Sequence, residues 1–322
     1  MEMTTIAELS GGRAVAIVGA GLVGSGWAIV YARAGLKVKV FDSNPEITRK
    51  ALPLIEKQLT RLHRHGLVAE DPSAILARIT TVATLAEAVE GTFYVQESVL
   101  ERVDVKRQLM LDLDALAGAD LVVGSSTSGI PGSAFALGLR LSPRVLIVHP
   151  VNPPYLVPVV ELVPSPETSP ATVALADALM RAVGQTVVHV RKEVEGFVLN
   201  RLQAVLLREA WALVQDGVAS CEDIDKTVRD GLGWRWSFMG PFETIDLNAP
   251  GGVADYAVRL GPLYQRIADS RRHEQPWDEG LIRQVEAQRR EHLAHAELES
   301  RRAWRDERLM EFAVRRAPDP DH

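Results

Sequence analysis

The sequence predicts an α/β fold, with a doubly wound, mostly parallel β-sheet in its N-terminal part and a second, all-helical domain after it. From residue 13 to about residue 190, short β-branched runs alternate with longer helical stretches, a pattern typical of parallel α/β layering. Past Lys192 the β-branched runs stop and helical periodicity continues. We therefore expect two domains, residues 1–192 and residues 193–322.

About seven strands and two long helices are expected in the first domain. The strands are residues 14–18, 38–41, 93–96, 121–124, 145–149, 159–163 and 186–190. The helices are residues 22–34 and 45–65. Pro45 suits a first helical turn and Gly66 a C-terminal cap. His63 and His65 complement the negative end of the helix dipole, an interpretation that we prefer to a metal-binding pair.

Composition and charge exclude several classes of protein. The chain has 322 residues, enough for two domains, and its single cysteine, Cys221, excludes an internal disulfide framework. Residues 1–10 contain no secretory signal and no apolar run is long enough to cross a bilayer, so we expect a soluble, cytoplasmic protein without a membrane partner. The net charge of −6 and the pI near 5.8 argue against nucleic-acid binding.

A glycine motif follows the first expected strand. Residues 19–24 read Gly-Ala-Gly-Leu-Val-Gly, and Asp42 ends the next strand, 18 residues after Gly24. This is the context of a dinucleotide-binding βαβ unit of the Rossmann type. Gly19 permits the tight turn, Gly21 lets the backbone approach a pyrophosphate, and Gly24 allows close packing of helix on strand. Asp42 would bind the adenosine ribose, and because no arginine follows it we predict NAD rather than NADP.

An imidazole and an acid occur in neighbouring expected strands. Glu161 is a lone carboxylate in the otherwise apolar run 158–163, where an unpaired charge would be costly. Twelve positions earlier, the run 145–148 ends in His149. Adjacent strands could bring the two side chains together as a general base and the group that orients it. Together with the cofactor motif, this indicates an enzyme that removes a proton from an alcohol while a nicotinamide takes the hydride.

Further polar residues are expected beside that pair, because ligands bind at the carboxyl ends of the strands in a doubly wound sheet. A Ser-Ser-Thr-Ser tetrapeptide follows the fourth expected strand; we interpret Ser125 as turn chemistry and Ser128 as a site candidate. Asn152 lies in the stiff turn before Glu161 and is a candidate substrate contact. Asn200 lies at the start of the first helix of the second domain. The apolar residues around it form no clean stripe that would place its side chain on the solvent-facing side of the helix.

These residues together resemble the 3-hydroxyacyl-CoA dehydrogenase family. The resemblance spans nearly the whole chain and is carried by residues 19–24, 126–128, 149–153, 161 and 196–201. A narrower resemblance is to the lambda-crystallin branch of that family, which has L-gulonate 3-dehydrogenase activity. It is carried by residues 149–155, 160–164, 192–203, 231–235 and 301–307.

The resemblance implies a role for each site residue. His149 would be the base and Glu161 its orienter, while Ser128 and Asn200 would hydrogen-bond the reacting oxygen. The implied cofactor contacts are Leu22, Val23, Asp42, Glu101, Lys106 and Ser126, the last near the nicotinamide. From the residues alone, Glu101 and Lys106 would be an exposed pair after a strand end.

The substrate is the less constrained inference. The narrower resemblance implies oxidation of L-gulonate to 3-dehydro-L-gulonate. An acyl-CoA would call for basic groups along helix 45–65, where basic and acidic residues are mixed and the lysine-rich insertion of the wider family is missing. Arg235, between Trp234 and Trp236, could instead bind a small carboxylate bidentately. A surface arginine stacked on an aromatic face is an equal alternative.

Two other readings stay open. One keeps the chemistry and changes the substrate, to a 3-hydroxyacyl-CoA such as 3-hydroxybutyryl-CoA or to a short 3-hydroxy acid such as carnitine. The other is an NAD-binding structural protein without turnover, against which the four intact catalytic candidates argue. The apolar stretch 197–214, with Trp211, is expected to pack against a second copy, and the resemblance implies a homodimer.

Overall fold

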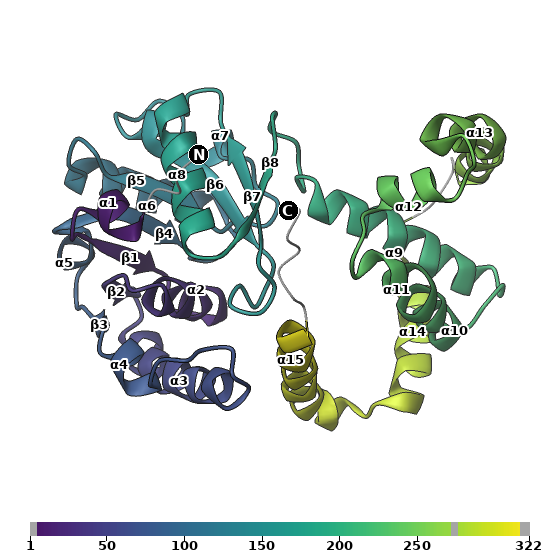
Figure 1. The fold of residues 1–322 in the computed structure, drawn as a ribbon, viewed down its shortest axis with the longest axis horizontal. Coiled ribbons are helices and arrows are strands. Elements are labelled where there is room, and N and C mark those ends of the chain that lie inside the picture. Colours follow the sequence, from purple (N-terminus) through teal and green to yellow (C-terminus); the bar gives the residue numbers. More distant parts are fainter. Residues whose placement is uncertain (1–4, 272–275, 316–322) are drawn as a thin grey trace. The chain divides into compact units, whose positions relative to one another are not determined.

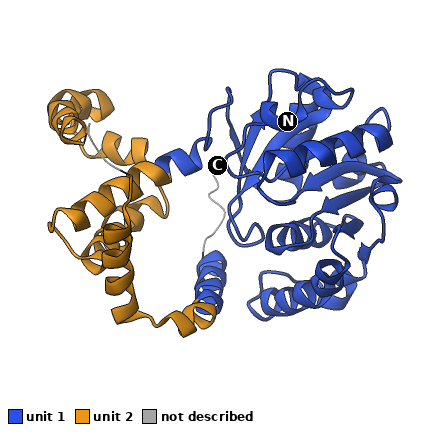
Figure 2. Cartoon of the chain, turned by 180° about the vertical axis from the view of Figure 1, so that it is seen from behind, with its two compact units in different colours: residues 1–202, 302–322 blue, residues 203–301 orange. Residues whose placement is uncertain are grey.

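The computed structural model describes residues 5–271 and 276–315, which divide into two compact units (Figure 2). Unit 1 contains the described residues up to Leu202 and from Arg302 onward, and unit 2 is Gln203–Arg301. The first four residues of the N-terminal segment considered above lie outside the described residues. The division of function at residue 192 stays a prediction. Among the described helices, none combines the length and the apolar character that crossing a bilayer requires.

Unit 1 is built on an eight-stranded sheet with the order β3-β2-β1-β4-β5-β6-β7-β8 (Figure 1). The strands are β1 (Ala14–Val18), β2 (Val38–Phe41), β3 (Ile79–Thr81), β4 (Thr92–Glu97), β5 (Val122–Ser125), β6 (Val145–Pro150), β7 (Val159–Pro164) and β8 (Thr186–His189). Neighbouring strands pair in parallel, except that β6 and β7 are antiparallel. The predicted α/β fold with a mostly parallel sheet is confirmed.

One strand escaped prediction. In β3 only Ile79 is buried, while the two threonines that follow it are exposed, so the segment lacks the apolar run by which the other strands were predicted. The predicted bounds of β1 and β2 are those observed, and the other predicted strands differ from the observed ones by one residue at one or both ends.

Helices cover both faces of the sheet. In unit 1 they are α1 (Ile6–Ser10), α2 (Leu22–Arg33), α3 (Pro45–Arg64), α4 (Pro72–Leu76), α5 (Leu85–Val89), α6 (Val103–Leu116), α7 (Ser133–Ala136) and α8 (Pro170–Ala182), with a 3-10 turn at Ser142–Arg144. Val15 and Ile17 of β1 pack into one core cluster, and Ala16 and Val18 into the other. A central strand buried on both faces explains its uninterrupted apolar sequence.

The end of α3 contacts the C-terminal helix α15 (Leu298–Arg315). As predicted, Pro45 lies in the first turn of α3 and Gly66 follows the helix with a φ of 72°. His65 Nε2 lies 2.5 Å from Glu307 Oε2, and Arg61 forms an ion pair with the same carboxylate at 2.8 Å. His63 Nδ1 instead lies 3.0 Å from the carbonyl oxygen of Val68. The two histidines therefore have separate partners.

Unit 2 is helical. Its helices are most of α9 (Leu199–Gln215), α10 (Cys221–Lys226), a π-helical segment (Thr227–Leu232), α11 (Gly233–Trp236), α12 (Pro241–Leu247), α13 (Gly252–Ser270) and α14 (Glu279–His292), followed by a 3-10 turn (His295–Glu297). The all-helical character predicted for this part of the chain is confirmed. Trp211 of α9 stacks on Trp277, with 4.2 Å between ring centroids.

Candidate active site

The glycine motif lies at the point where the strand order of the sheet reverses, between β1 and β4. Gly19 follows β1 with a φ of 98°, and a Cβ there would lie 2.5 Å from the backbone of Ser98. A Cβ on Gly24 would lie 1.8 Å from the carbonyl oxygen of Gly19. By contrast, no atom lies within 4 Å of a Cβ placed on Gly21. The first and third glycines are required by packing, and the second leaves an open approach to the N-terminus of α2, as binding of a pyrophosphate requires.

The acidic residue of the βαβ unit is fixed against the glycine turn. Asp42 Oδ2 accepts a hydrogen bond from the Ala20 amide at 2.8 Å, and its Oδ1 accepts one from the Asn44 amide at 2.9 Å. Leu22 is 70% exposed and begins α2 beside this turn, followed by the partly buried Val23. Three of the predicted cofactor contacts, Leu22, Val23 and Asp42, therefore lie around one turn.

The predicted imidazole and carboxylate meet across the antiparallel pair of strands. His149 of β6 is in direct register with Glu161 of β7, and its Nδ1 lies 2.8 Å from Glu161 Oε2. Both side chains are buried, with exposed fractions of 6% and 1%. An acid in contact with one ring nitrogen fixes the orientation of the ring and leaves Nε2 as the other proton-carrying position.

The second oxygen of Glu161 accepts two backbone hydrogen bonds. The amides of Val198 and Leu199, at the beginning of α9, donate to Oε1 at 2.9 and 3.0 Å. Burial raises the pKa of this carboxyl, but the hydrogen bonds from His149 and from the two amides outweigh burial and lower the pKa below its ordinary value. Glu161 is therefore held as the carboxylate, and the start of a helix is part of its support.

An unusual turn delivers those two amides. Phe197 has a φ of 50°, the one positive value at a non-glycine position in the described ranges, and Gly196 before it has a φ of 74°. The Phe197 ring is buried and lies 5.6 Å from the His149 ring. The sequence did not indicate this role, and the expectation that Phe197 belongs to an intermolecular apolar face is wrong because it packs in the core of unit 1. Strained backbone is often found at functional sites.

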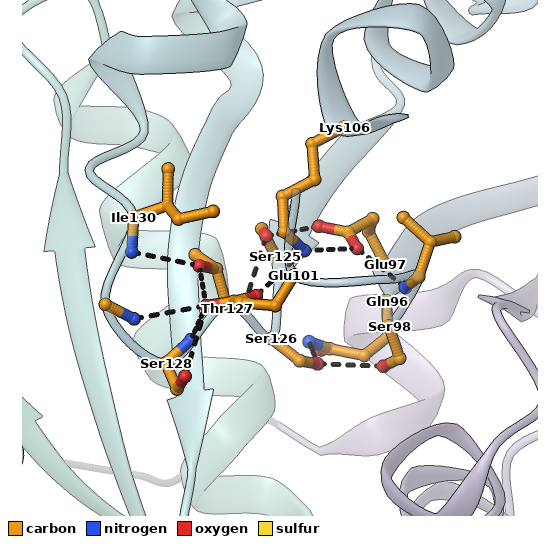
Figure 3. A network of polar contacts seen from close by, with 12 residues as sticks. Gln96, Glu97, Ser98, Glu101, Lys106, Ser125, Ser126, Thr127, Ser128 and Ile130 are labelled. Atoms are coloured by element: carbon orange, nitrogen blue, oxygen red, sulfur yellow. Dashed lines mark hydrogen bonds and ion pairs between the residues drawn. The ribbon is translucent and has the colours of Figure 1, made fainter. Parts of the chain in front are cut away.

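Ser128 and Asn200 also lie together. Asn200 Nδ2 donates to the backbone oxygen of Ser128 at 2.5 Å. Glu101 fixes the loop from the other side, because its Oε1 accepts hydrogen bonds from the Thr127 hydroxyl at 2.7 Å, from the Ser128 amide at 2.8 Å and from the Ser128 hydroxyl at 3.1 Å (Figure 3). Partial burial raises the pKa of Glu101, but these hydrogen bonds and the charge of Lys106 lower it overall.

Lys106 corrects one sequence interpretation. It is not part of an exposed pair: only 1% of its surface is accessible, and its Nζ lies 2.8 Å from Oε1 of the fully buried Glu97 and 3.4 Å from Glu101 Oε2 (Figure 3). Ser125 makes the turn contact that was expected, since its hydroxyl oxygen accepts a hydrogen bond from the Thr127 amide at 3.3 Å, but it is also buried at the end of β5 and donates to Glu97 Oε2. Glu97 was not predicted, although a carboxylate that directly follows an apolar run is a signal close to the one that identified Glu161.

The remaining predicted residues are placed less centrally. Ser126 is hydrogen-bonded to Gln96 and Ser98 beside the Glu97 network (Figure 3). Its hydroxyl also accepts a hydrogen bond from the Trp27 indole. Asn152 is exposed, beyond the end of β6. Arg235 belongs to unit 2, on α11, whereas the other predicted site residues belong to unit 1.

The fold and the glycine turn define an NAD-binding protein of the Rossmann class. Residues 14–194 match the family model of the 3-hydroxyacyl-CoA dehydrogenase NAD binding domain, and residues 196–294 match that of the 3-hydroxyacyl-CoA dehydrogenase C-terminal domain. The chain belongs to the 3-hydroxyacyl-CoA dehydrogenase family, whose members are NAD-dependent dehydrogenases acting on CH–OH groups.

Similar proteins include lambda-crystallin of Oryctolagus cuniculus, which is 42% identical over 303 residues, covering 93% of this chain and 95% of the relative. L-carnitine dehydrogenase of Streptomyces coelicolor is 39% identical over 251 residues and 78% of each chain. Among solved structures, (S)-3-hydroxybutyryl-CoA dehydrogenase of Ralstonia eutropha is 29% identical, with a TM-score of 0.65 over 80% of this chain and 88% of its own. An NAD⁺-dependent 5-formyl-3-hydroxy-2-methylpyridine 4-carboxylic acid 5-dehydrogenase is 28% identical. Its TM-score is 0.79, and the match covers 94% of this chain and 96% of the solved chain.

Proposed function

We propose that the protein oxidises the 3-hydroxyl group of a small hydroxy acid, L-gulonate, to give 3-dehydro-L-gulonate. The observation that carries the chemistry is the buried contact of 2.8 Å between His149 Nδ1 and Glu161 Oε2. A general base needs an oriented ring and a group that favours its protonated form, and this pair supplies both.

In the proposed reaction, His149 takes the hydroxyl proton on Nε2, since Nδ1 faces Glu161. Glu161 stabilises the imidazolium that forms, and its own charge is held by the amides at the start of α9. Asn200 has a second amide N–H beside the one given to Ser128, and it would position the oxygen as it becomes a carbonyl. The Ser128 hydroxyl would join it by turning its single hydrogen from Glu101 Oε1 to that oxygen. The chemistry that bound NAD would supply here is an acceptor for the hydride that leaves the carbinol carbon.

The proposed cofactor site combines the glycine turn with the loops after β2, β4 and β5. Its residues are Gly19, Gly21, Leu22, Val23, Gly24, Asp42, Glu101, Lys106 and Ser126. The close approach of Gly19 to Ser98 and the open side of Gly21 support this assignment, because both leave backbone rather than side chain facing the crevice.

Two features support a small acid over an acyl-CoA. The basic residues at the end of α3 have partners within the chain: Arg61 and His65 contact Glu307, and Arg61 also donates to the Ala303 carbonyl oxygen. They are therefore less free to bind the phosphates of a coenzyme A. Arg235, with Trp234 and Trp236 on either side in α11, is proposed to bind the substrate carboxylate, with Asn152 as a further substrate contact.

Similarity keeps two related substrates in contention. The likeness to an L-carnitine dehydrogenase favours carnitine as a second candidate, and the solved 3-hydroxybutyryl-CoA dehydrogenase favours a thioester as a third. A structural role without turnover is the alternative from another class, named because lambda-crystallin is among the relatives.

The experiment compares kcat/KM for NADH formation from L-gulonate, L-carnitine and (S)-3-hydroxybutyryl-CoA under identical conditions. We expect L-gulonate to be preferred. Preference for the thioester or for carnitine would overturn the substrate and keep the chemistry. NAD binding without NADH formation from any of the three would favour the structural alternative.

We also propose that the protein is a homodimer. Large apolar side chains on unit 2 are strongly exposed in the single chain, including Val205, Phe242 and Val258 at 71%, 78% and 76%. Apolar surface of this kind is typical of a protein interface. Light scattering coupled to gel filtration should give a mass of twice 35.3 kDa; a monomer mass would reject the proposal.

A further inference from the structure

A chain of hydrogen bonds runs through the interior of unit 1 from two buried phenols. The hydroxyl groups of Tyr31 and Tyr94 both donate to Gln96 Oε1, at 2.9 and 3.0 Å. Burial raises the pKa of both phenols, so they remain protonated donors. With its oxygen occupied, Gln96 uses Nε2 to donate to Ser126 Oγ at 2.8 Å. The direction of the chain is therefore from the core toward Ser126.

Counting donors at Ser126 shows where the chain ends. A serine hydroxyl accepts through two lone pairs and donates one hydrogen. Ser126 Oγ accepts from Gln96 Nε2 and from the indole N–H of the fully buried Trp27, at 3.1 Å. Both lone pairs are occupied, so its hydrogen goes to Ser98 Oγ, 2.9 Å away (Figure 3). Ser98 is then an acceptor in this contact, and its own hydrogen is not used by the chain.

Ser98 lies at a position where its hydroxyl hydrogen could bind a cofactor. It follows β4 directly, it is only partly buried, and its amide donates to the carbonyl oxygen of Val18 at the end of β1. Its backbone lies against Gly19, so it lies at the point where the strand order reverses, the place at which a doubly wound sheet binds its ligand. In the part of the chain that the structure describes, the Ser98 hydroxyl is hydrogen-bonded to Ser126.

We propose that Ser98 is a cofactor-binding residue whose hydroxyl donates a hydrogen bond to the nicotinamide mononucleotide half of NAD. The adenosine half belongs to the β1–β2 side, where Asp42 stands, and the other half crosses to the β4–β5 side, where Ser98 and Ser126 stand. The three hydrogen-bonding positions of the Ser126 hydroxyl are already occupied, so its contribution to the proposed cofactor site is made through Ser98 and not by direct contact of that hydroxyl. The inference rests on NAD binding and on the proposed crevice, but not on the identity of the substrate.

The test measures dissociation constants of NAD, ADP-ribose and AMP by calorimetry, for the full chain and its variants. Ser98→Ala should weaken NAD and ADP-ribose by roughly two- to tenfold, the range expected for one neutral hydrogen bond. AMP, which lacks the second half of the dinucleotide, should bind as before. Ser98→Thr keeps the hydroxyl and should bind all three ligands like the wild type.

Two outcomes would overturn the proposal. One is unchanged binding of NAD by Ser98→Ala. The other is an equal loss for NAD, ADP-ribose and AMP, which would mean that the residue only supports the shape of the glycine turn. Because no substrate is present, the result is independent of whether L-gulonate, L-carnitine or a thioester is oxidised. A preference for another substrate would leave this measurement valid.

Discussion

Unit 1 contains two carboxylates, Glu97 and Glu161, that are equally buried but have different hydrogen-bond partners. Glu97, at the end of β4, contacts the ammonium group of Lys106 at 2.8 Å, the Val99 amide at 2.8 Å and the Ser125 hydroxyl. Glu161, in β7, contacts an imidazole and two amides. An ammonium group stays charged at neutral pH, whereas an imidazole exchanges its proton there.

Because their partners differ, Glu97 is expected to have a structural role and Glu161 a catalytic one. Glu97 and Lys106 neutralise each other and tie the loops after β4 and β5, including Glu101, which holds Ser128. Glu161 faces a group that can gain and lose a proton, so its charge is available to stabilise one state of that group over the other. The sequence shows only a carboxylate in an apolar run in both cases. Substituting the partner of each carboxylate should therefore affect stability in one case and turnover in the other.

The largest expected effect is on stability, from Lys106→Met. It leaves Glu97 buried without its counter-ion, which should lower the free energy of unfolding by about 3–5 kcal/mol in urea denaturation. The double variant Glu97→Gln/Lys106→Met carries no buried charge at these positions and should recover most of the loss. Arg102→Ala, which breaks an exposed pair with Asp104, is the control and should cost less than about 1 kcal/mol. Equal losses from Lys106→Met and Arg102→Ala would contradict the structural role.

The next effect is on turnover. His149→Ala should reduce kcat by about a hundredfold or more on the preferred substrate, because the proton acceptor is lost, while the dissociation constant of NAD changes little. His189→Ala removes a half-exposed histidine of the edge strand β8 that contacts Asp177 of α8, and it should leave kcat unchanged. Ordinary turnover by His149→Ala would assign the base to another group.

The comparison also shows which parts of the site the sequence can predict. The contact between His149 and Glu161 was predictable from two apolar runs that lie close together in the sequence. His149 directly follows the first run, and Glu161 is the one charged residue within the second. The turn at Phe197 was not predictable, because nothing in the composition indicates a positive φ at a phenylalanine, and only the folded chain places its ring beside His149. Lys106 was misjudged for a related reason: only the tertiary fold places the buried Glu97 within reach of its ammonium group.

A smaller effect should come from the turn that supports Glu161. Gly196 has a φ of 74°, so Gly196→Ala should cost about 1–2 kcal/mol of backbone strain and should move the Val198 and Leu199 amides, lowering kcat. Gly138→Ala is a matched control, because Gly138 has a φ of 72° and open space around its Cβ position. We expect a similar loss of stability in both variants, with reduced kcat only in Gly196→Ala. Equal kcat values would separate the turn from the chemistry.

The smallest effect is a pH dependence of stability. The folded pKa of Glu161 lies below its ordinary value of 4.5, because hydrogen bonds from His149, Leu199 and Val198 outweigh burial. A lowered folded pKa contributes stability that is fully present above the unfolded pKa and is lost as the pH falls through the folded pKa. The stability advantage of the wild type over Glu161→Gln should therefore be steady above about pH 5 and shrink below pH 4.5. Urea titrations at several pH values measure it. An advantage that grew on acidification would mean that the protonated acid, rather than the carboxylate, is the form bound by the amides of α9.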